Sequence, residues 1–152
     1  MTDGRFSEED VILREYRSGE YEDLLRLWER AGLPYKPKGR DRREAIEKEA
    51  SETNAVFLIA EAQGGVVGSV LGTHDGRKGW INRLAVAPEL RRLGIGKMLV
   101  EEVERRLSKV GIEIIACLIE DWNSESIRFF ENLGYVRQQD VHYFTKRRHP
   151  DI

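Results

Sequence analysis

Two glycines separated by one residue stand where an amphipathic helix is expected to begin. Apolar residues recur every four positions from Ile95 to Leu107, and charged residues fill most other positions, which predicts a helix. No Ser, Thr, Asp or Asn occurs between Glu89 and Val100, so no side chain is available to cap its first backbone N–H groups. Gly94 and Gly96 let an anion approach these groups, and the helix dipole favours negative charge there. We therefore predict an anion-binding helix start; a glycine turn capped only by water is the alternative.

The residues around these glycines exclude two familiar phosphate sites. A P-loop would need glycine at Arg91 and Ser or Thr at Met98. A dinucleotide-binding fingerprint would need a third glycine at Leu99. What remains is the pattern Arg-x-x-Gly-x-Gly, between a predicted strand that ends at Val86 and the predicted helix.

Two adjacent carboxylates, Glu120 and Asp121, are the candidate proton acceptors. They follow an apolar run over residues 112–119, which is short and bounded as in a buried strand. A helical crossover joins parallel strands, and α/β sheets place their chemistry at the carboxyl ends of such strands. Both carboxylates are accordingly candidates for a general base, with an ordinary solvated loop as the alternative.

The rest of the chain supplies the elements that would hold these groups. Alternation of apolar and polar residues predicts strands, apolar residues at helical spacing predict helices, and glycines and prolines mark the turns. The expected order is one strand, two helices, three strands, a helix, a strand, a helix and two strands. Their ranges are 11–17, 21–31, 42–52, 55–62, 66–73, 80–86, 95–110, 112–119, 123–133, 135–137 and 141–146.

Composition limits the classes of function. A chain of 152 residues suits a single domain, residues 1–152, with a substantial core. The 25 basic and 27 acidic residues give a net charge of −2, so we expect binding to neither nucleic acid nor membrane. One cysteine excludes an intrachain disulfide, and three scattered histidines show no metal-ligand spacing, so we expect no metal. We find no apolar run long enough to span a bilayer and no signal peptide, which predicts a cytoplasmic protein.

The glycine motif resembles the acyl-CoA-binding motif of the GNAT superfamily of N-acyltransferases, which reads Gln or Arg, two residues, Gly, one residue, Gly or Ala. A second segment, Asn123–Tyr135, is similar to the family pattern Asn-x-x-Ala-x-x-x-Tyr-x-x-x-Gly-Phe, with Ser126 for Ala, Phe130 for Tyr and Tyr135 for Phe. The resemblance covers nearly the whole chain and is strongest from 81 to 135. It implies an α/β (α+β) fold with a mixed, mostly antiparallel sheet of six to seven strands. That sheet would splay in a V between its fourth and fifth strands, with four helices packed around it.

The resemblance also implies which residues bind acetyl-CoA, the expected co-substrate. The backbone of Leu84, Ala85 and Val86 would hold the pantetheine arm, and the Val86 N–H would face the oxyanion. Asn123 would contact the pantetheine from the other side, or only cap its own helix. The pyrophosphate would lie against the loop and the first helical turn, which comprise Arg91, Arg92, Leu93, Gly94, Ile95, Gly96 and Lys97.

The implied activity is acetyl transfer from acetyl-CoA to a primary amine of a small molecule, a protein N-terminus or a lysine. Phe130 stands where the family usually has a tyrosine that protonates the departing thiolate. Phenylalanine cannot donate a proton, so water, Tyr135 or Tyr143 would have to replace it. A non-catalytic acyl-CoA sensor is the alternative function, and a homodimer is left open.

The acceptor is less defined than the cofactor. Members of the family often use a carboxylate or an ordered water reached from the strand at 80–86, which here carries Trp80 and Asn82, neither of them a base. Basic residues on the expected acceptor side would favour an acidic acceptor: Lys36, Lys38, Arg40, Arg42 and Arg43. An ordinary solvated basic face is the alternative. Glu120 and Asp121 would instead favour an acceptor with positive charge. A nucleic-acid-binding module using the basic clusters RDRR and KRRH is disfavoured, because these lack interleaved aromatic residues.

Overall fold

The computed structural model, which describes residues 7–150 and 152, is built around one five-stranded sheet. The strand order is β1-β2-β3-β4-β5, and neighbours are antiparallel except β4 and β5, which are parallel. The strands are Ile12–Glu15 (β1), Ala55–Ala62 (β2), Gly65–His74 (β3), Lys78–Val86 (β4) and Ile114–Cys117 (β5).

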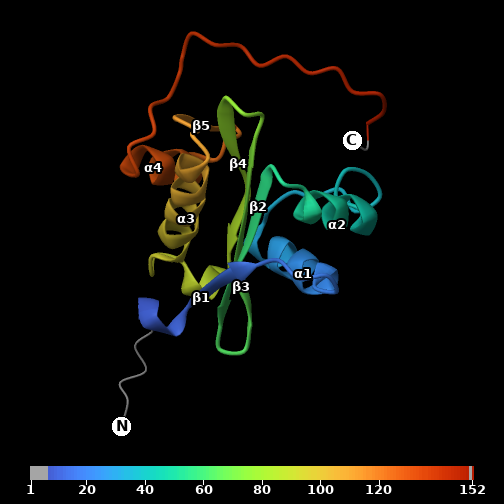
Figure 1. Cartoon of the computed structure of the whole chain (residues 1–152), viewed down its shortest axis with the longest axis vertical. Helices are drawn as coiled ribbons and strands as arrows, with labels where there is room; N and C mark the ends of the chain where they lie inside the picture. The colour runs from blue at the N-terminus through green and yellow to red at the C-terminus, as the bar shows by residue number, and fades with distance from the viewer. Residues whose placement is uncertain (1–6, 151) are drawn as a thin grey trace.

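Four α-helices cover the two faces of this sheet. They are Tyr21–Ala31 (α1), Arg43–Ser51 (α2), Ile95–Lys109 (α3) and Ser124–Asn132 (α4), and short 3-10 turns lie at Glu8–Asp10 and Pro88–Leu90. In Figure 1, α1 and α2 lie on one side of the sheet, and α3 and α4 lie on the other. The sequence predictions for the first nine elements are confirmed, with the ends shifted by at most two residues.

Helix α3 packs closely against the middle of the sheet. Its apolar face, which includes Leu99, Val103 and Leu107, is almost fully buried. A Cβ atom at Gly72 on β3 would lie only 2.5 Å from Cγ1 of Val103, so glycine is what lets the helix approach the strand. This contact places the glycine-rich start of α3 beside the end of β4.

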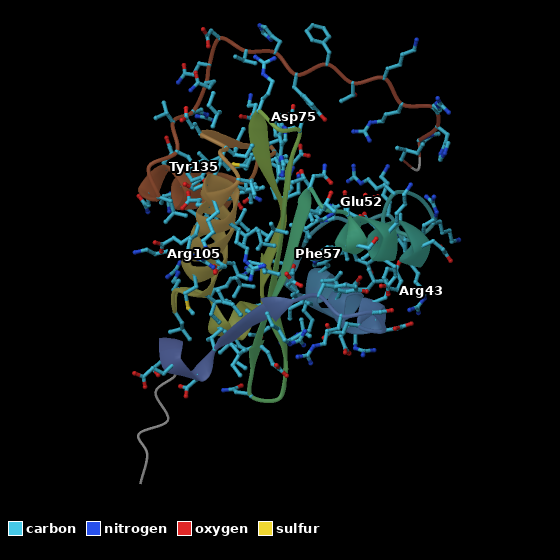
Figure 2. All side chains as sticks on the ribbon, viewed as in Figure 1. Arg43, Glu52, Phe57, Asp75, Arg105 and Tyr135 are labelled. Atoms are coloured by element: carbon cyan, nitrogen blue, oxygen red, sulfur yellow. The ribbon has the colours of Figure 1, made fainter. Side chains whose placement is uncertain are left out.

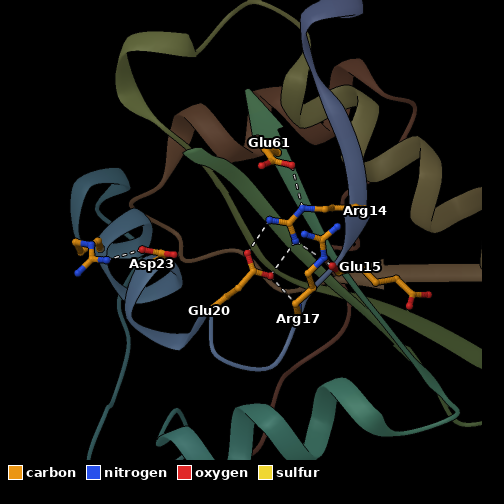
Figure 3. Close-up of polar contacts among 7 residues, drawn as sticks. Arg14, Glu15, Arg17, Glu20, Asp23 and Glu61 are labelled. Atoms are coloured by element: carbon orange, nitrogen blue, oxygen red, sulfur yellow. Dashed lines mark hydrogen bonds and ion pairs between the residues drawn. The ribbon is translucent and has the colours of Figure 1, made fainter. Parts of the chain in front are cut away.

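On the opposite face, an ion-pair network attaches α1 to the sheet. Figure 3 shows Arg14 of β1 between Glu61 of β2 and Glu20, which directly precedes α1. The guanidinium donates to Glu61 at 3.2 Å and to the two oxygens of Glu20 at 2.8 and 2.6 Å. Hydrogen bonding to Arg14 lowers the pKa of the Glu20 carboxyl. The network therefore sets where the first helix leaves the sheet.

The two strands predicted at 135–137 and 141–146 are absent, so the sheet in the described part of the chain has five strands and not six to seven. Residues 136–149, here called the C-terminal arm, form an extended exposed segment that passes from the side of α4 to the side of α2 (Figure 1). A physical reason lies in the sequence: residues 135–149 contain no Gly, Asn or Pro, and Asp140 is the single residue there of a type that favours a tight turn. The prediction recognised strand-forming residues, but the turn between them has only this one weak signal.

Candidate functional site

The start of α3 has the uncapped geometry that the sequence predicts. Gly94 precedes the helix in the left-handed region, with a φ of 90°, and no side chain caps the first turn. Arg92 also has a positive φ, of 66°. Positive φ next to free backbone N–H groups is the arrangement found in concave anion-binding backbone sites. The helix start can therefore receive an anion through its backbone.

The side chains of this motif have different roles. Arg91 donates to the carbonyl oxygen of Ala31 at 2.7 Å, so its guanidinium attaches the loop to the end of α1. Ile95 is 1% exposed and belongs to the core, so only its backbone can meet a ligand. Arg92 and Lys97 are exposed cations at the helix start, suited to a phosphate charge. Leu93 is also exposed.

Gly96 lies where three elements meet. A Cβ atom at this position would be 3.2 and 3.3 Å from Cζ and Cε2 of Phe129 on α4, and 3.8 Å from Cγ2 of Val86 on β4. The absence of a side chain thus serves packing between α3 and α4 as well as access to the backbone. Sequence analysis had assigned Gly96 to the anion only.

Strand β4 separates from β5 before it ends. The two strands pair from Lys78 with Ile114 to Ile81 with Cys117, whereas β4 continues to Val86. Along residues 82–86, which include Leu84, Ala85 and Val86, the structure pairs β4 with β3 alone. The edge of β4 that faces away from β3 is therefore open at the position where the sequence analysis expects the splay.

A bulge in β4 precedes these residues and is held by side chains. Ser69 pairs with Ala85 and Leu71 with Asn82, so one residue of β3 faces two of β4, and Arg83 takes a φ of 56°. The Ser69 hydroxyl donates to the carbonyl oxygen of Arg83 at 2.9 Å and accepts from Nε1 of Trp28 at 3.0 Å. A bulge redirects the strand that follows it, here Leu84–Val86.

The side chain of Arg83 connects this bulge to the loop before α2. Its guanidinium donates to Asp41 at 2.6 Å and to the carbonyl oxygen of Pro34 at 3.3 Å, and it lies over the ring of Trp28. Burial lowers the pKa of Arg83 despite the adjacent carboxylate. Asp41 is 2% exposed and also accepts the N–H of Lys36 at 2.8 Å. The sequence analysis missed this network, because its members are far apart in the chain and no local pattern joins them.

Glu120 and Asp121 follow β5 as predicted, and both are exposed. Asp121 lies 3.8 Å from the guanidinium of Arg137, and both side chains are at least half exposed. Neither carboxylate is enclosed in an apolar environment. Their surroundings thus match the solvated loop that the sequence analysis gave as the alternative.

The residues of α4 mainly serve packing and capping. Asn123 accepts the N–H of Ser126 at 3.2 Å and so caps the helix. Phe130 is 6% exposed and makes edge-to-face contacts with Phe129 and Tyr135. The Tyr135 hydroxyl donates to Glu104 on α3 at 2.7 Å, and burial together with this bond raises the pKa of Tyr135. Its proton is already engaged, which makes Tyr135 a poor substitute for the tyrosine that Phe130 replaces.

The basic residues on the expected acceptor side are largely paired within the chain. Arg43 forms an ion pair with Glu22, and Arg42 donates to the carbonyl oxygen of Gly39. Arg40 lies 3.7 Å from Asp41, and Lys36 donates to the carbonyl oxygen of Pro150. These contacts weaken the expectation of an acidic acceptor.

In residues 7–150 and 152, no group of three or more His, Cys, Asp or Glu side chains is arranged to hold a metal ion. No helix in the same residues is both long enough and apolar enough to span a bilayer.

Solved structures share this fold. An aminoglycoside N-acetyltransferase, AAC(6')-Iy, in complex with CoA aligns with a TM-score of 0.75 at 20% identity, over 95% of this chain and 98% of that one. The PaiA N-acetyltransferase of Thermoplasma acidophilum in complex with coenzyme A aligns with a TM-score of 0.76 at 20% identity, over 86% and 92%.

Sequence comparison adds the family. An acetyltransferase of Photorhabdus laumondii is 35% identical over 136 residues, which cover 89% of this chain and 94% of that protein. One of Sodalis glossinidius is 33% identical over 137 residues, with the same coverage. The profile of the acetyltransferase (GNAT) family matches residues 20–135. The chain therefore belongs to the GNAT family and is an acetyltransferase.

Proposed function

We propose that this protein transfers the acetyl group of acetyl-CoA to a primary amine on a small molecule, a protein N-terminus or a lysine. The observation that carries the proposal is the uncapped, glycine-rich start of α3 beside the open end of β4. Related structures that contain coenzyme A support it. The non-catalytic sensor alternative finds no support in these comparisons, since the relatives are acetyltransferases.

Acetyl-CoA would be held largely by backbone groups. Its pyrophosphate would accept hydrogen bonds at the start of α3, with Arg92 and Lys97 supplying positive charge. Its pantetheine would lie along the open edge of Leu84–Val86 as an added strand does. Asn123, which caps α4, would face it from the other side.

The same edge offers a donor for the oxyanion. The N–H of Ala87 donates to the carbonyl oxygen of Val67 on β3, at 2.8 Å. Successive N–H groups of a strand point to opposite sides, so the N–H of Val86 points away from β3. It is free to stabilise negative charge on the thioester oxygen as the amine attacks.

Proton transfer would then depend on water. The neutral amine forms a C–N bond to the acetyl carbon, the C–S bond breaks, and coenzyme A leaves as a thiolate that takes up a proton. Phe130 cannot donate that proton and the hydroxyl of Tyr135 is bound to Glu104, so we assign this role to water. The proton of the amine would pass to water or to the exposed Glu120 or Asp121.

One experiment tests binding and turnover together. Free-thiol release from acetyl-CoA is measured over a panel of aminoglycosides, polyamines and peptides with free N-termini or lysines, and mass spectrometry locates the acetyl group on the product. We expect one acceptor class to be turned over.

Acetyl-CoA at 100 times its Kd should also stabilise the fold by about 2.7 kcal/mol, whereas ATP should not. Equal stabilisation by ATP and acetyl-CoA would contradict the proposed site.

We further propose a single domain over residues 1–152 that acts in the cytoplasm without a metal ion. The family match from 20 to 135 and the continuous sheet support the domain. Activity that survives treatment with EDTA would support metal independence. Inactivation by EDTA, reversed when a metal ion is restored, would contradict it.

A further inference from the structure

The segment between α1 and α2, residues 32–42, is here called the linking segment. Arg91, in the loop before α3, donates to the carbonyl oxygen of Ala31, the residue directly before this segment, at 2.7 Å. An ion pair between Arg30 and Glu89 joins the same two parts of the chain. The last turn of α1 and the loop before α3 are thus connected twice at the point where the linking segment begins.

Arg83 holds the linking segment from β4. Its guanidinium donates to the carbonyl oxygen of Pro34 at 3.3 Å and to the carboxylate of Asp41 at 2.6 Å. Asp41 also accepts the N–H of Lys36, so the segment closes on itself around this carboxylate. In the chain Arg83 directly precedes Leu84, the first residue along which acetyl-CoA would lie. Both arginines that hold the linking segment therefore belong to elements that the proposed function assigns to the cofactor.

The linking segment lies on the face of the sheet from which the amine would approach. Side chains alternate between the two faces of β4. A Cβ atom at Gly79 would lie 2.8 Å from Cδ1 of Leu107 on α3, so Gly79 faces α3, whereas Asn82 faces the other side. Figure 2 shows Arg43 of α2 across the sheet from Arg105 of α3. Acetyl-CoA bound at the start of α3 would leave the face of α1 and α2, where Asn82 is exposed, open to the amine.

We propose that Arg91 is a positioning residue for the amine and not a phosphate ligand. The backbone of its loop would bind the pyrophosphate, while its guanidinium holds the end of α1, and with it the linking segment, in a fixed position relative to the thioester. This inference rests on the proposed acetyl transfer and adds the side chain that connects its two substrate sites. It changes the role that the motif Arg-x-x-Gly-x-Gly gives to its first residue.

Arg91 also lies at the C-terminal end of α1, where a cation stabilises the free carbonyl groups. A cap of this kind alone would support α1 equally whether acetyl-CoA is bound or absent. Arg91 differs from such a cap because the backbone that carries it belongs to the proposed cofactor loop. A bound pyrophosphate restrains that backbone and therefore restrains the contact with Ala31. The order of the linking segment should accordingly depend on acetyl-CoA.

Arg92 provides a matched control in the same loop. Both arginines are exposed, and they are adjacent in the chain. Arg91→Met and Arg92→Met remove the same charge from the same loop. Among the described residues, only the first of these substitutions removes a contact with α1. A difference between the two variants therefore reports the contact with Ala31 and not the charge of the loop.

The test measures hydrogen exchange of residues 32–42 in the full chain, with acetyl-CoA absent and at saturation. In wild type, acetyl-CoA should slow this exchange by about fivefold or more, the lower limit of typical coupling between two sites. Arg91→Met should lose most of this effect, and Arg92→Met should keep it. Calorimetry sets the saturating concentration for each variant, so that a loss of affinity is not mistaken for a loss of coupling. Circular dichroism verifies that each variant is folded.

Steady-state kinetics give a second readout, with the amine that the acceptor panel identifies. Arg91→Met should raise the KM for the amine by about fivefold, the factor that one ordinary hydrogen bond supplies, and the Kd for acetyl-CoA by a smaller factor. Arg92→Met should do the reverse, because it removes positive charge offered to the pyrophosphate.

The outcomes separate this inference from the proposed function. Failure of wild type to bind acetyl-CoA overturns both. Binding of acetyl-CoA without slower exchange in the linking segment overturns the role of Arg91 alone, even when acetyl transfer occurs. That role is also overturned if Arg91→Met keeps the effect of acetyl-CoA, or if Arg91→Met and Arg92→Met lose it equally.

Discussion

Removing the carboxylate of Asp41 should destabilise this protein more than breaking an exposed ion pair. Asp41 is 2% exposed, and its two oxygens accept from Arg83 at 2.6 Å and from the N–H of Lys36 at 2.8 Å. In Asp41→Ala both donors lose their acceptor. The guanidinium of Arg83 remains against the ring of Trp28 without the carboxylate that it is hydrogen-bonded to.

The magnitude follows from this burial. Removing one partner of a buried ion pair costs about 3–5 kcal/mol. The side chain of Arg83 is 17% exposed and keeps some contact with water, so we expect the lower end, about 3 kcal/mol. At 2–4 °C per kcal/mol for a protein of this size, the Tm should fall by roughly 6–12 °C. Asp41→Ala combined with Arg83→Met should cost less than the sum of the two changes, because no unpaired charge remains.

Urea and thermal unfolding of wild type, both single variants and the double variant give a double-mutant cycle for Asp41 and Arg83. Asp23→Ala and Arg26→Met, at an exposed pair on α1, form the matched cycle and should give small, additive changes. If turnover occurs as proposed, Asp41→Ala should raise KM for the amine more than for acetyl-CoA, since the loop before α2 lies away from α3. Additive effects of Asp41→Ala and Arg83→Met would refute the reasoning, as would a Tm unchanged in Asp41→Ala.

Gly96→Ala should weaken acetyl-CoA binding and cost about 1–3 kcal/mol of stability through overpacking against the ring of Phe129, whereas Gly65→Ala, with open space around it, should do neither. Calorimetry measures the affinity for acetyl-CoA, and urea unfolding measures the stability. Equal effects of the two substitutions would contradict the packing role of Gly96. Phe130→Tyr should leave acetyl-CoA affinity intact and hold or raise kcat, so a tenfold fall in kcat would show that this aromatic does not face the sulfur. Burial raises the pKa of Cys117 to about 11, so iodoacetamide at pH 8 should label the folded protein much more slowly than the urea-unfolded one, and equal labelling rates would contradict this burial.

The sequence by itself was sufficient where the determining interactions are local. Helical and strand periodicity located nine of the elements, because the face that each buries repeats within a few residues of chain. The uncapped start of α3 could also be predicted from the sequence, since a cap must lie within one turn of the first free N–H groups. The glycine motif before α3 and the segment Asn123–Tyr135 indicated the family, since each is continuous in the chain.

Tertiary structure decided what depends on residues distant in sequence. Arg83 and Asp41 form a buried pair only because the fold brings β4 and the loop before α2 together beside Trp28. Sequence analysis singled out Phe130, but the aromatic residue that lies against Gly96 is its neighbour Phe129. The final strands illustrate the limit most directly: residues 141–146 have the composition of a strand, but a strand forms only against a partner edge. Local sequence sets the preference for extended chain, whereas the packing of the whole molecule determines whether an edge is within reach.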